Sequence, residues 1–175
     1  MQRDVIAAAE VEAALHALMN STDSEARRAA DAGLRQFQAT AQAWNTAVAL
    51  IANAASPQAK LFGATILCNK LRGGRGGGLA PADVNALRGR CLQLLRGIES
   101  GQLRSQLCRA VCLLLVDVAD GPGSLLLREA ASANLPIDTT LELLTLVPDG
   151  GAWLQEAEVA TIQLFLLELL DHACD

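Results

Sequence analysis

The chain has 175 residues, a formal net charge of −5 and a pI near 5.0; 51% of its residues are hydrophobic and 3% are aromatic. This length suffices for one ordinary domain with a sizeable core, and the acidic balance argues against nucleic acid or an anionic membrane as a whole-surface partner. Alanine and leucine dominate and tyrosine is missing, whereas sheet proteins usually contain more Val, Ile, Thr and aromatic residues, so the composition predicts an all-helical chain.

The first predicted elements are two helices separated by the break NSTDS at 20–24. Val11, Leu15 and Leu18 recur with the spacing of one helical face. Ser24 is predicted to cap the second helix.

A third helix is expected from about 41 to 54, and SPQ at 56–58 then supplies a cap with Pro at the first helical position, which predicts the start of a fourth. That helix runs into RGGRGG at 72–77, where Gly73 is expected to end it as a left-handed cap. The stretch 73–80 is interpreted as a Gly-rich inter-repeat loop.

Two other interpretations of the glycines are weaker. The segment lacks the Lys-Ser/Thr ending of a Walker loop and no strand is predicted before it, which argues against a phosphate cradle. Two Arg-Gly-Gly units without interleaved aromatic residues, in an acidic chain, are also weak evidence for RNA binding.

The predicted helices group into antiparallel pairs at about 5–40, 41–72, 81–120 and 123–148, with the start of a further pair at 152–174. A period of about forty residues is typical of HEAT and armadillo arrays. We therefore expect an all-α, HEAT-type α-solenoid. A four-helix bundle is the competing architecture, although it would ordinarily have fewer and longer helices.

The N-terminal stretch MQRDVIAAAE has no apolar run of signal-peptide length, and AVCLLLV at 110–116 is too short to span a membrane. These features predict a soluble intracellular protein. The cysteines, an odd number set mostly in apolar surroundings, favour reduced core thiols over disulfides; they are Cys68, Cys91, Cys108, Cys112 and Cys174.

Candidate catalytic and metal-binding groups give little signal. Cys108 and Cys112 lie one helical turn apart, but no second ligand pair accompanies them, so core packing is favoured over a metal site. His172 lies near Asp171 and Cys174 without an oxyanion-hole motif, which favours coincidence over a nucleophile pair. We expect neither enzyme activity nor a cofactor.

The stretch EARRAADAGLRQFQATAQAWNTAVALI at 25–51 resembles the N-terminal domain of the importin-β (karyopherin-β) superfamily. That domain opens with an Arg-x-x-Ala-acidic-x-x-Leu-x-x-Phe helix, which a Trp-bearing helix follows. The matching positions here are Arg27, Ala30, Asp31, Leu34, Phe37 and Trp44.

Later stretches extend the resemblance over roughly residues 5–150, in order along the chain. SPQAKLFGATILCNKLR at 56–72 looks like the B helix, the second helix, of the next pair, and its FGA and KL are closest to the transportin-SR branch. LRSQLCRAVCLLLVDVA at 103–119 and LELLTLVPDG at 141–150 fit the same branch. Family members are usually several times longer, so we expect an N-terminal fragment or a truncated product.

The resemblance implies a nuclear transport receptor module that shuttles between nucleus and cytoplasm. Its implied partners are the small GTPase Ran in its GTP form, on the concave surface lined by B helices, and protein cargo. Phenylalanine-glycine nucleoporins are implied on the convex side. Neither direct nucleic-acid binding nor membrane insertion is expected. A general HEAT-repeat scaffold without Ran binding is the first alternative, and a small helical enzyme with a Cys nucleophile is the second.

Helical geometry names candidate contacts under this resemblance, because at 100° per residue polar side chains of three predicted helices each follow one line. The candidate concave-face residues are Arg28, Asp31, Arg35, Gln58, Phe62, Thr65, Asn69, Arg72, Gln106 and Arg109. Such a stripe is otherwise an ordinary solvated face. An aromatic ring on it, as at Phe62, either anchors a partner or is covered by a neighbouring helix.

Overall fold

The computed structural model of the chain describes residues 2–73, 78–99, 101–115 and 121–147, and also residues 159, 160, 163, 164 and 167. The helices are α1 (Gln2–Asn20), α2 (Ser24–Ala39), α3 (Ala43–Asn53), α4 (Pro57–Arg72), α5 (Pro81–Leu95), α6 (Gln102–Leu113), α7 (Pro122–Ser132) and α8 (Ile137–Leu146). None of the helices in these ranges combines the length and the apolar character needed to cross a bilayer. The pair expected from 152, and the centre of the Gly-rich loop, lie outside the described residues.

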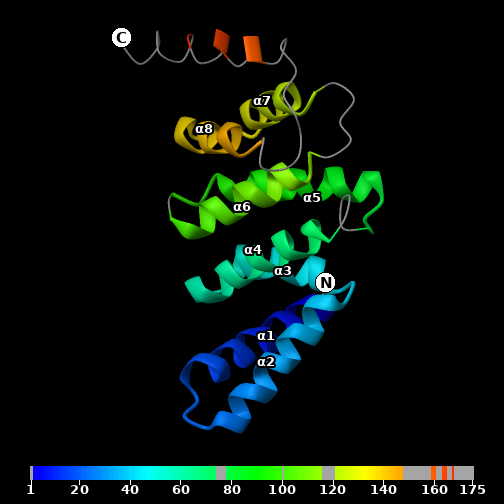
Figure 1. Ribbon diagram of the computed structural model, residues 1–175, viewed down its shortest axis with the longest axis vertical. Helices are drawn as coiled ribbons and strands as arrows, with labels where there is room; N and C mark the ends of the chain where they lie inside the picture. The colour runs from blue at the N-terminus through cyan, green and yellow to red at the C-terminus, as the bar shows by residue number, and fades with distance from the viewer. Residues whose placement is uncertain are drawn as a thin grey trace.

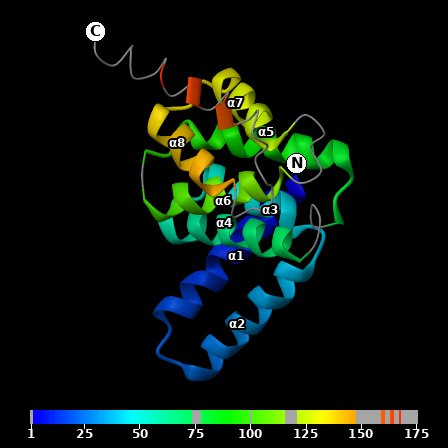
Figure 2. The same ribbon diagram turned by 45° about the horizontal axis from the view of Figure 1, so that its top comes forward.

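Consecutive helices form antiparallel pairs, and the pairs stack along the long axis of the molecule (Figure 1). We call α1, α3, α5 and α7 the A helices and α2, α4, α6 and α8 the B helices. Turning the molecule keeps the stack open and does not reveal a bundle closed around one centre (Figure 2). The fold is therefore the predicted all-α, HEAT-like solenoid, in which each pair is covered by the next.

Two hydrophobic clusters hold the stack together. The larger one runs from α3 to α8, and the smaller one joins α1 and α2 to α3 and α4. Leu67, Leu107 and Leu143, one from each of three successive B helices, have no exposed surface. Burying each such leucine contributes roughly 1.5–3 kcal/mol. Phe37 and Phe62 pack against both clusters and so connect them.

Helix starts follow local chemistry, with one shift from the expectation. The Ser56 hydroxyl accepts a hydrogen bond from the Ala59 amide at 3.4 Å before a Pro in the first turn, as predicted. The predicted cap at Ser24 is wrong by one residue: the Asp23 carboxylate caps α2 by accepting from the Glu25 amide at 2.9 Å. Aspartate and serine are equally good caps, so the adjacent pair left the choice open.

The predicted left-handed cap at Gly73 is also wrong. Gly73 has a φ of −70° in the right-handed region, which any residue can adopt. Within the described part of this connection, the left-handed glycine is Gly78, with a φ of +78°. Glycine is required there because a Cβ disfavours that conformation.

Helices α3 and α4 approach each other most closely at Gly63. A Cβ on Gly63 would lie 2.7 Å from the carbonyl oxygen of Ala47 and 3.1 Å from Cγ1 of Ile51. Ala47 on the facing helix is also small and fully buried. The glycine in the FGA stretch thus lets the backbones of the two helices meet.

The first pair reaches the rest of the stack mainly through α1, which packs on α3, while α2 makes few contacts with α3 and α4. Lys70 of α4 bridges this junction. Its Nζ donates to the carbonyl oxygens of Gln38 at 3.0 Å and Thr40 at 2.9 Å, and lies 5.1 Å from the centroid of the Trp44 ring. Lys70 therefore satisfies carbonyls at the end of α2 and adds a cation–π contact to α3.

A buried ion pair joins α5 to α7. The Arg88 side chain is 5% exposed and binds Glu129 through two hydrogen bonds, Nε to Oε2 at 2.7 Å and Nη2 to Oε1 at 2.8 Å. Arg88 Nη1 also donates to the carbonyl oxygen of Leu114, just after α6. One guanidinium thereby ties together three helices, which compensates for its removal from water.

We expect Gly63→Ala to lower the free energy of unfolding by about 1–3 kcal/mol, because the new methyl group meets a backbone oxygen that cannot move alone. Chemical denaturation followed by circular dichroism measures the change. Gly33→Ala is the matched control, since nothing lies within 4 Å of its added Cβ. That change should raise stability by about 0.5–1 kcal/mol. Equal effects of both substitutions would contradict the close approach of α3 and α4.

Candidate functional site

Seven of the ten candidate residues lie on one surface, formed by the outer sides of α4 and α6. The two helices pack lengthwise against each other, so their outer sides adjoin. We call this surface the B-helix face; it comprises Gln58, Phe62, Thr65, Asn69 and Arg72 of α4 with Gln106 and Arg109 of α6. Its members are exposed or half-buried, while the opposite sides of both helices are in the core.

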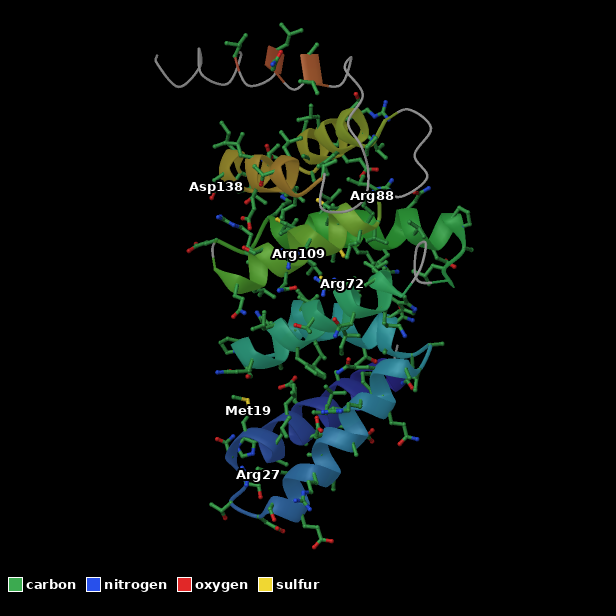
Figure 3. The ribbon with its side chains drawn as sticks, in the orientation of Figure 1. Met19, Arg27, Arg72, Arg88, Arg109 and Asp138 are labelled. Carbon is green, nitrogen blue, oxygen red and sulfur yellow. The ribbon has the colours of Figure 1, made fainter. Side chains whose placement is uncertain are left out.

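The three candidates on α2 stand apart from this surface. Arg28 and Arg35 are exposed, and Asp31 forms an ion pair with Arg35 at 3.0 Å within the helix. Such an exposed pair contributes only a few tenths of a kcal/mol. Figure 3 shows Arg27, next to Arg28, at the end of the molecule remote from Arg72.

Of the three helical stripes that supply the candidate residues, those of α4 and α6 therefore lie side by side, and that of α2 does not. The first pair joins the stack through α1 on α3, so α2 does not run alongside α4 for its length. The sequence carried no signal for this offset, because it is set by contacts between pairs and not by periodicity within one helix.

Phe62 is half-buried and packs against both hydrophobic clusters. Of the two possibilities for an aromatic ring on this stripe, the structure therefore shows neighbouring helices covering much of it. The remaining exposed edge lies between Gln58 and Thr65 on the same helix. Phe62 thus contributes chiefly to the junction of the first two pairs.

At the seam between α4 and α6 a thiol connects the two B helices. Cys68 Sγ donates a hydrogen bond to the carbonyl oxygen of Gln106 at 3.1 Å. Burial raises the pKa of the Cys68 thiol, and the positive charges of Arg72 and Arg109 oppose this rise. Both guanidinium groups therefore act on the same small region, and Figure 3 shows the two arginines near each other.

At the next seam, between α6 and α8, sequence reasoning missed a network centred on Arg104. Its Nε donates to Glu142 at 2.8 Å, and its Nη1 donates to Asp138 at 2.5 Å and to the carbonyl oxygen of Glu99 at 2.7 Å. Ser105 also donates to Glu142. The hydrogen bond from Arg104 lowers the pKa of Asp138. The carboxylates are 34 and 38 residues from Arg104 in sequence, so no local pattern could have identified them.

The cysteines of the described ranges are buried thiols. Burial raises the pKa of Cys91 to about 12 and also raises that of Cys108. Cys112 donates to the carbonyl oxygen of Leu143 at 3.4 Å. Within the residues that the structure describes, no three His, Cys, Asp or Glu side chains gather in a way that could hold a metal ion. The pair of His172 and Cys174 lies outside those residues.

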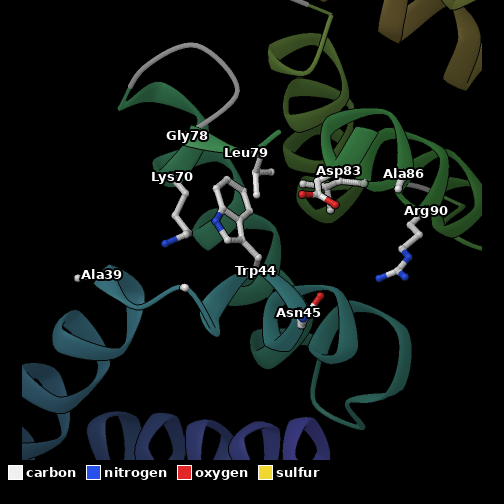
Figure 4. Close-up of a pocket in the computed structure, with 11 residues that line it drawn as sticks. Ala39, Trp44, Asn45, Lys70, Gly78, Leu79, Asp83, Ala86 and Arg90 are labelled. Atoms are coloured by element: carbon white, nitrogen blue, oxygen red, sulfur yellow. The ribbon is translucent and has the colours of Figure 1, made fainter. Parts of the chain in front are cut away.

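A second candidate site is a groove of about 600 Å³ between the start of α3 and α5 (Figure 4). Trp44 forms part of its wall, with Lys70 beside the indole ring. Leu79 at the end of the loop 73–80 and Leu87 of α5 add apolar surface, and the charged rim includes Asp83 and Arg90 of α5. The groove lies between two A helices and is distinct from the B-helix face.

The family model of the importin-beta N-terminal domain matches residues 30–96, which run from α2 to the end of α5. The match supports the importin-β superfamily, and it gives no support to the more specific transportin-SR branch. It includes the α4 part of the B-helix face and the Trp44 groove, but not Gln106 or Arg109. A search of the curated proteins found no match to the chain.

We expect the native thiols to react with an aromatic disulfide reagent at pH 8 far more slowly than the same thiols in denaturant, because burial keeps them protonated and covered. The measurement uses a Cys174→Ser background, since that residue lies outside the described ranges. Rapid reaction of Cys68, Cys91, Cys108 or Cys112 in the native chain would contradict their placement in the core.

The same burial predicts a pH dependence of stability. The folded chain keeps the Cys91 proton up to a pKa of about 12, whereas the unfolded chain releases it near 9.0. The contribution of Cys91 is therefore fully present below about pH 9 and falls by roughly 1.4 kcal/mol per pH unit between about pH 9 and the folded pKa of about 12. Cys91→Ala should remove this part of the alkaline decline; an unchanged decline would contradict the assignment.

Proposed function

We propose that the chain is the N-terminal module of a nuclear transport receptor and binds Ran in its GTP form on the B-helix face. The observation that carries this proposal is the match of the importin-beta N-terminal domain to residues 30–96. The solenoid supports it, because stacked pairs present successive B helices side by side. In the importin-β family, this domain is the part that binds Ran-GTP.

The B-helix face offers binding chemistry and no reaction centre. Arg72 and Arg109 provide guanidinium donors, and Asn69 and Gln106 provide amides that both donate and accept. Affinity for a protein surface is then distributed over several modest contacts. We infer a non-enzymatic receptor whose specificity for the GTP form comes from the shape of the partner.

The stacked pairs also provide a basis for coupling Ran binding to release of protein cargo. Among the described helices, the main contacts between pairs are those between neighbouring pairs, so a partner that spans two pairs favours one relative orientation. A second ligand that favours another orientation then competes without occupying the same residues. This coupling, and movement between nucleus and cytoplasm, are parts of the proposed receptor function.

The test is a binding assay of the full chain with Ran loaded with GTP or GDP. The variant Asn69→Ala/Arg72→Ala/Arg109→Ala, which changes only residues of the B-helix face, should bind Ran-GTP at least about tenfold more weakly, a loss of about 1.4 kcal/mol. A matched control removes two arginines and one asparagine at exposed positions in α5, just after it and in α7, as Asn85→Ala/Arg96→Ala/Arg128→Ala. We expect the control to bind as the unmodified chain does.

Equal binding of both nucleotide forms, or no binding, would reject the proposal and favour the general HEAT-repeat scaffold. Unchanged affinity of the triple variant, with Ran-GTP still preferred, would reject only the assignment of the B-helix face. The thermal unfolding of each variant is measured alongside, so that a loss of folding is not taken for a loss of contact.

We further propose that phenylalanine-glycine nucleoporins bind in the Trp44 groove. The groove lies between A helices, on the side that the family resemblance assigns to these partners, and combines the Trp44 ring with Leu79 and Leu87. An apolar ring in such a groove gains roughly 25 cal/mol for each Å² removed from water. The charged residues at the rim limit the length of the groove and orient the peptide backbone on either side of the bound phenylalanine.

Ala86→Glu should weaken binding of a fluorescent phenylalanine-glycine peptide at least about fivefold, because the added carboxylate enters the groove from its α5 wall. Gln93→Glu adds the same charge at an exposed position of α5 that does not line the groove. Fluorescence anisotropy measures both affinities. Equal binding by the two variants would exclude the groove as the nucleoporin site.

A further inference from the structure

Two arginines at the seam of α4 and α6 lack the carboxylate partners found elsewhere in the fold. Arg72 is the exposed last residue of α4, and Arg109 is half-buried in α6. Among the described residues, neither side chain forms an ion pair, whereas Arg35, Arg88 and Arg104 each do. An uncompensated positive pair is notable in a chain whose net charge is −5.

The register of the two helices places these arginines side by side. The hydrogen bond from Cys68 to the carbonyl oxygen of Gln106 fixes one point of contact between α4 and α6. Arg72 follows Cys68 by four residues and Arg109 follows Gln106 by three, so each lies about one turn further along its helix. The two B helices run in the same direction, and Figure 3 shows both labelled side chains at this seam.

The seam between α6 and α8 shows what the same arrangement looks like when its charges are balanced. There, one guanidinium group, that of Arg104, is bound by the carboxylates of Asp138 and Glu142. At the α4–α6 seam two guanidinium groups act on the same thiol, that of Cys68, and, among the described residues, no carboxylate is bound to them. Like charges at close range repel, so an anion placed between them is stabilised by both.

We propose that Arg72 and Arg109 form a two-pronged anchor for neighbouring carboxylates in an acidic segment of a partner protein. Each guanidinium presents a planar fork that matches a carboxylate with two parallel hydrogen bonds. The amides of Asn69 and Gln106 lie one turn earlier on the same helices and can hold the backbone of that segment. The anchor rests on the proposed function only in placing the partner on the B-helix face.

The observations favour a protein segment over nucleic acid. Two cations neutralise two charges, whereas stable binding to a phosphate backbone takes many more contacts at physiological salt. The acidic charge of the rest of the chain opposes a polyanion that extends beyond the anchor. A short segment with two carboxylates avoids this repulsion and satisfies both arginines.

The test measures binding of the full chain to a fluorescein-labelled hexaglutamate peptide by fluorescence anisotropy, at an ionic strength of about 0.15 M, where the Debye length is about 8 Å. Arg72→Gln/Arg109→Gln should weaken binding at least about tenfold, because the charge-assisted hydrogen bonds from both guanidinium groups to the peptide carboxylates are lost. Arg96→Gln/Arg128→Gln is the matched control; it changes the net charge equally at exposed positions just after α5 and in α7, outside both proposed binding sites. We expect the control to change affinity less than about twofold, since exposed charges are well screened.

Three results would overturn the anchor: absence of binding to the unmodified chain, equal weakening by both double variants, or equal binding of a hexaglutamine peptide. Displacement of the peptide by inorganic phosphate, but not by chloride at the same ionic strength, would replace carboxylate by phosphate as the ligand. Ran-GTP binding without hexaglutamate binding removes the anchor and leaves the proposed function. Hexaglutamate binding without Ran-GTP binding rejects the proposed function and leaves the anchor.

Discussion

The close approach of α3 and α4 at Gly63 is the constraint on which the rest of the arrangement depends. Because no Cβ separates Gly63 from the carbonyl oxygen of Ala47, α4 lies with its backbone against its partner helix. The opposite side of α4 then reaches α6, where Cys68 meets Gln106. A wider spacing within this pair would shift α4 relative to both neighbours, and the B-helix face would lose its register.

Three consecutive residues in the last turn of α4 belong to three different parts of the molecule. Lys70 holds the end of α2 and the Trp44 ring, Leu71 is buried in the larger cluster, and Arg72 belongs to the B-helix face. The proposed nucleoporin groove and the proposed Ran surface therefore meet at one turn of helix. This proximity links two sites that lie on different sides of the solenoid.

Features with local causes were predictable from the sequence. Composition and periodicity predicted the all-α solenoid, and the Ser-Pro start of α4 was predicted correctly because cap and helix are adjacent in the chain. The outer positions of α4 and α6 followed from helical spacing. Features that depend on partners distant in sequence were missed. Nothing in the FGA stretch indicates that Gly63 lies against Ala47, and nothing around Arg104 indicates that it pairs with Asp138. The offset of α2 likewise depends on contacts between pairs.

The first helix pair is attached to the solenoid differently from the later pairs, and Lys70 is part of that attachment. From α3 onward, neighbouring pairs share a continuous apolar cluster. The helix α2 packs on α1, makes few contacts with α3 and α4, and has two carbonyl groups at its end held by the Lys70 ammonium group. Arg28 and Arg35 therefore lie on a helix that joins the stack chiefly through α1, whereas Arg72 and Arg109 lie on helices that pack directly in the larger cluster, so the reach between the two sets of arginines is set by how α1 rests on α3.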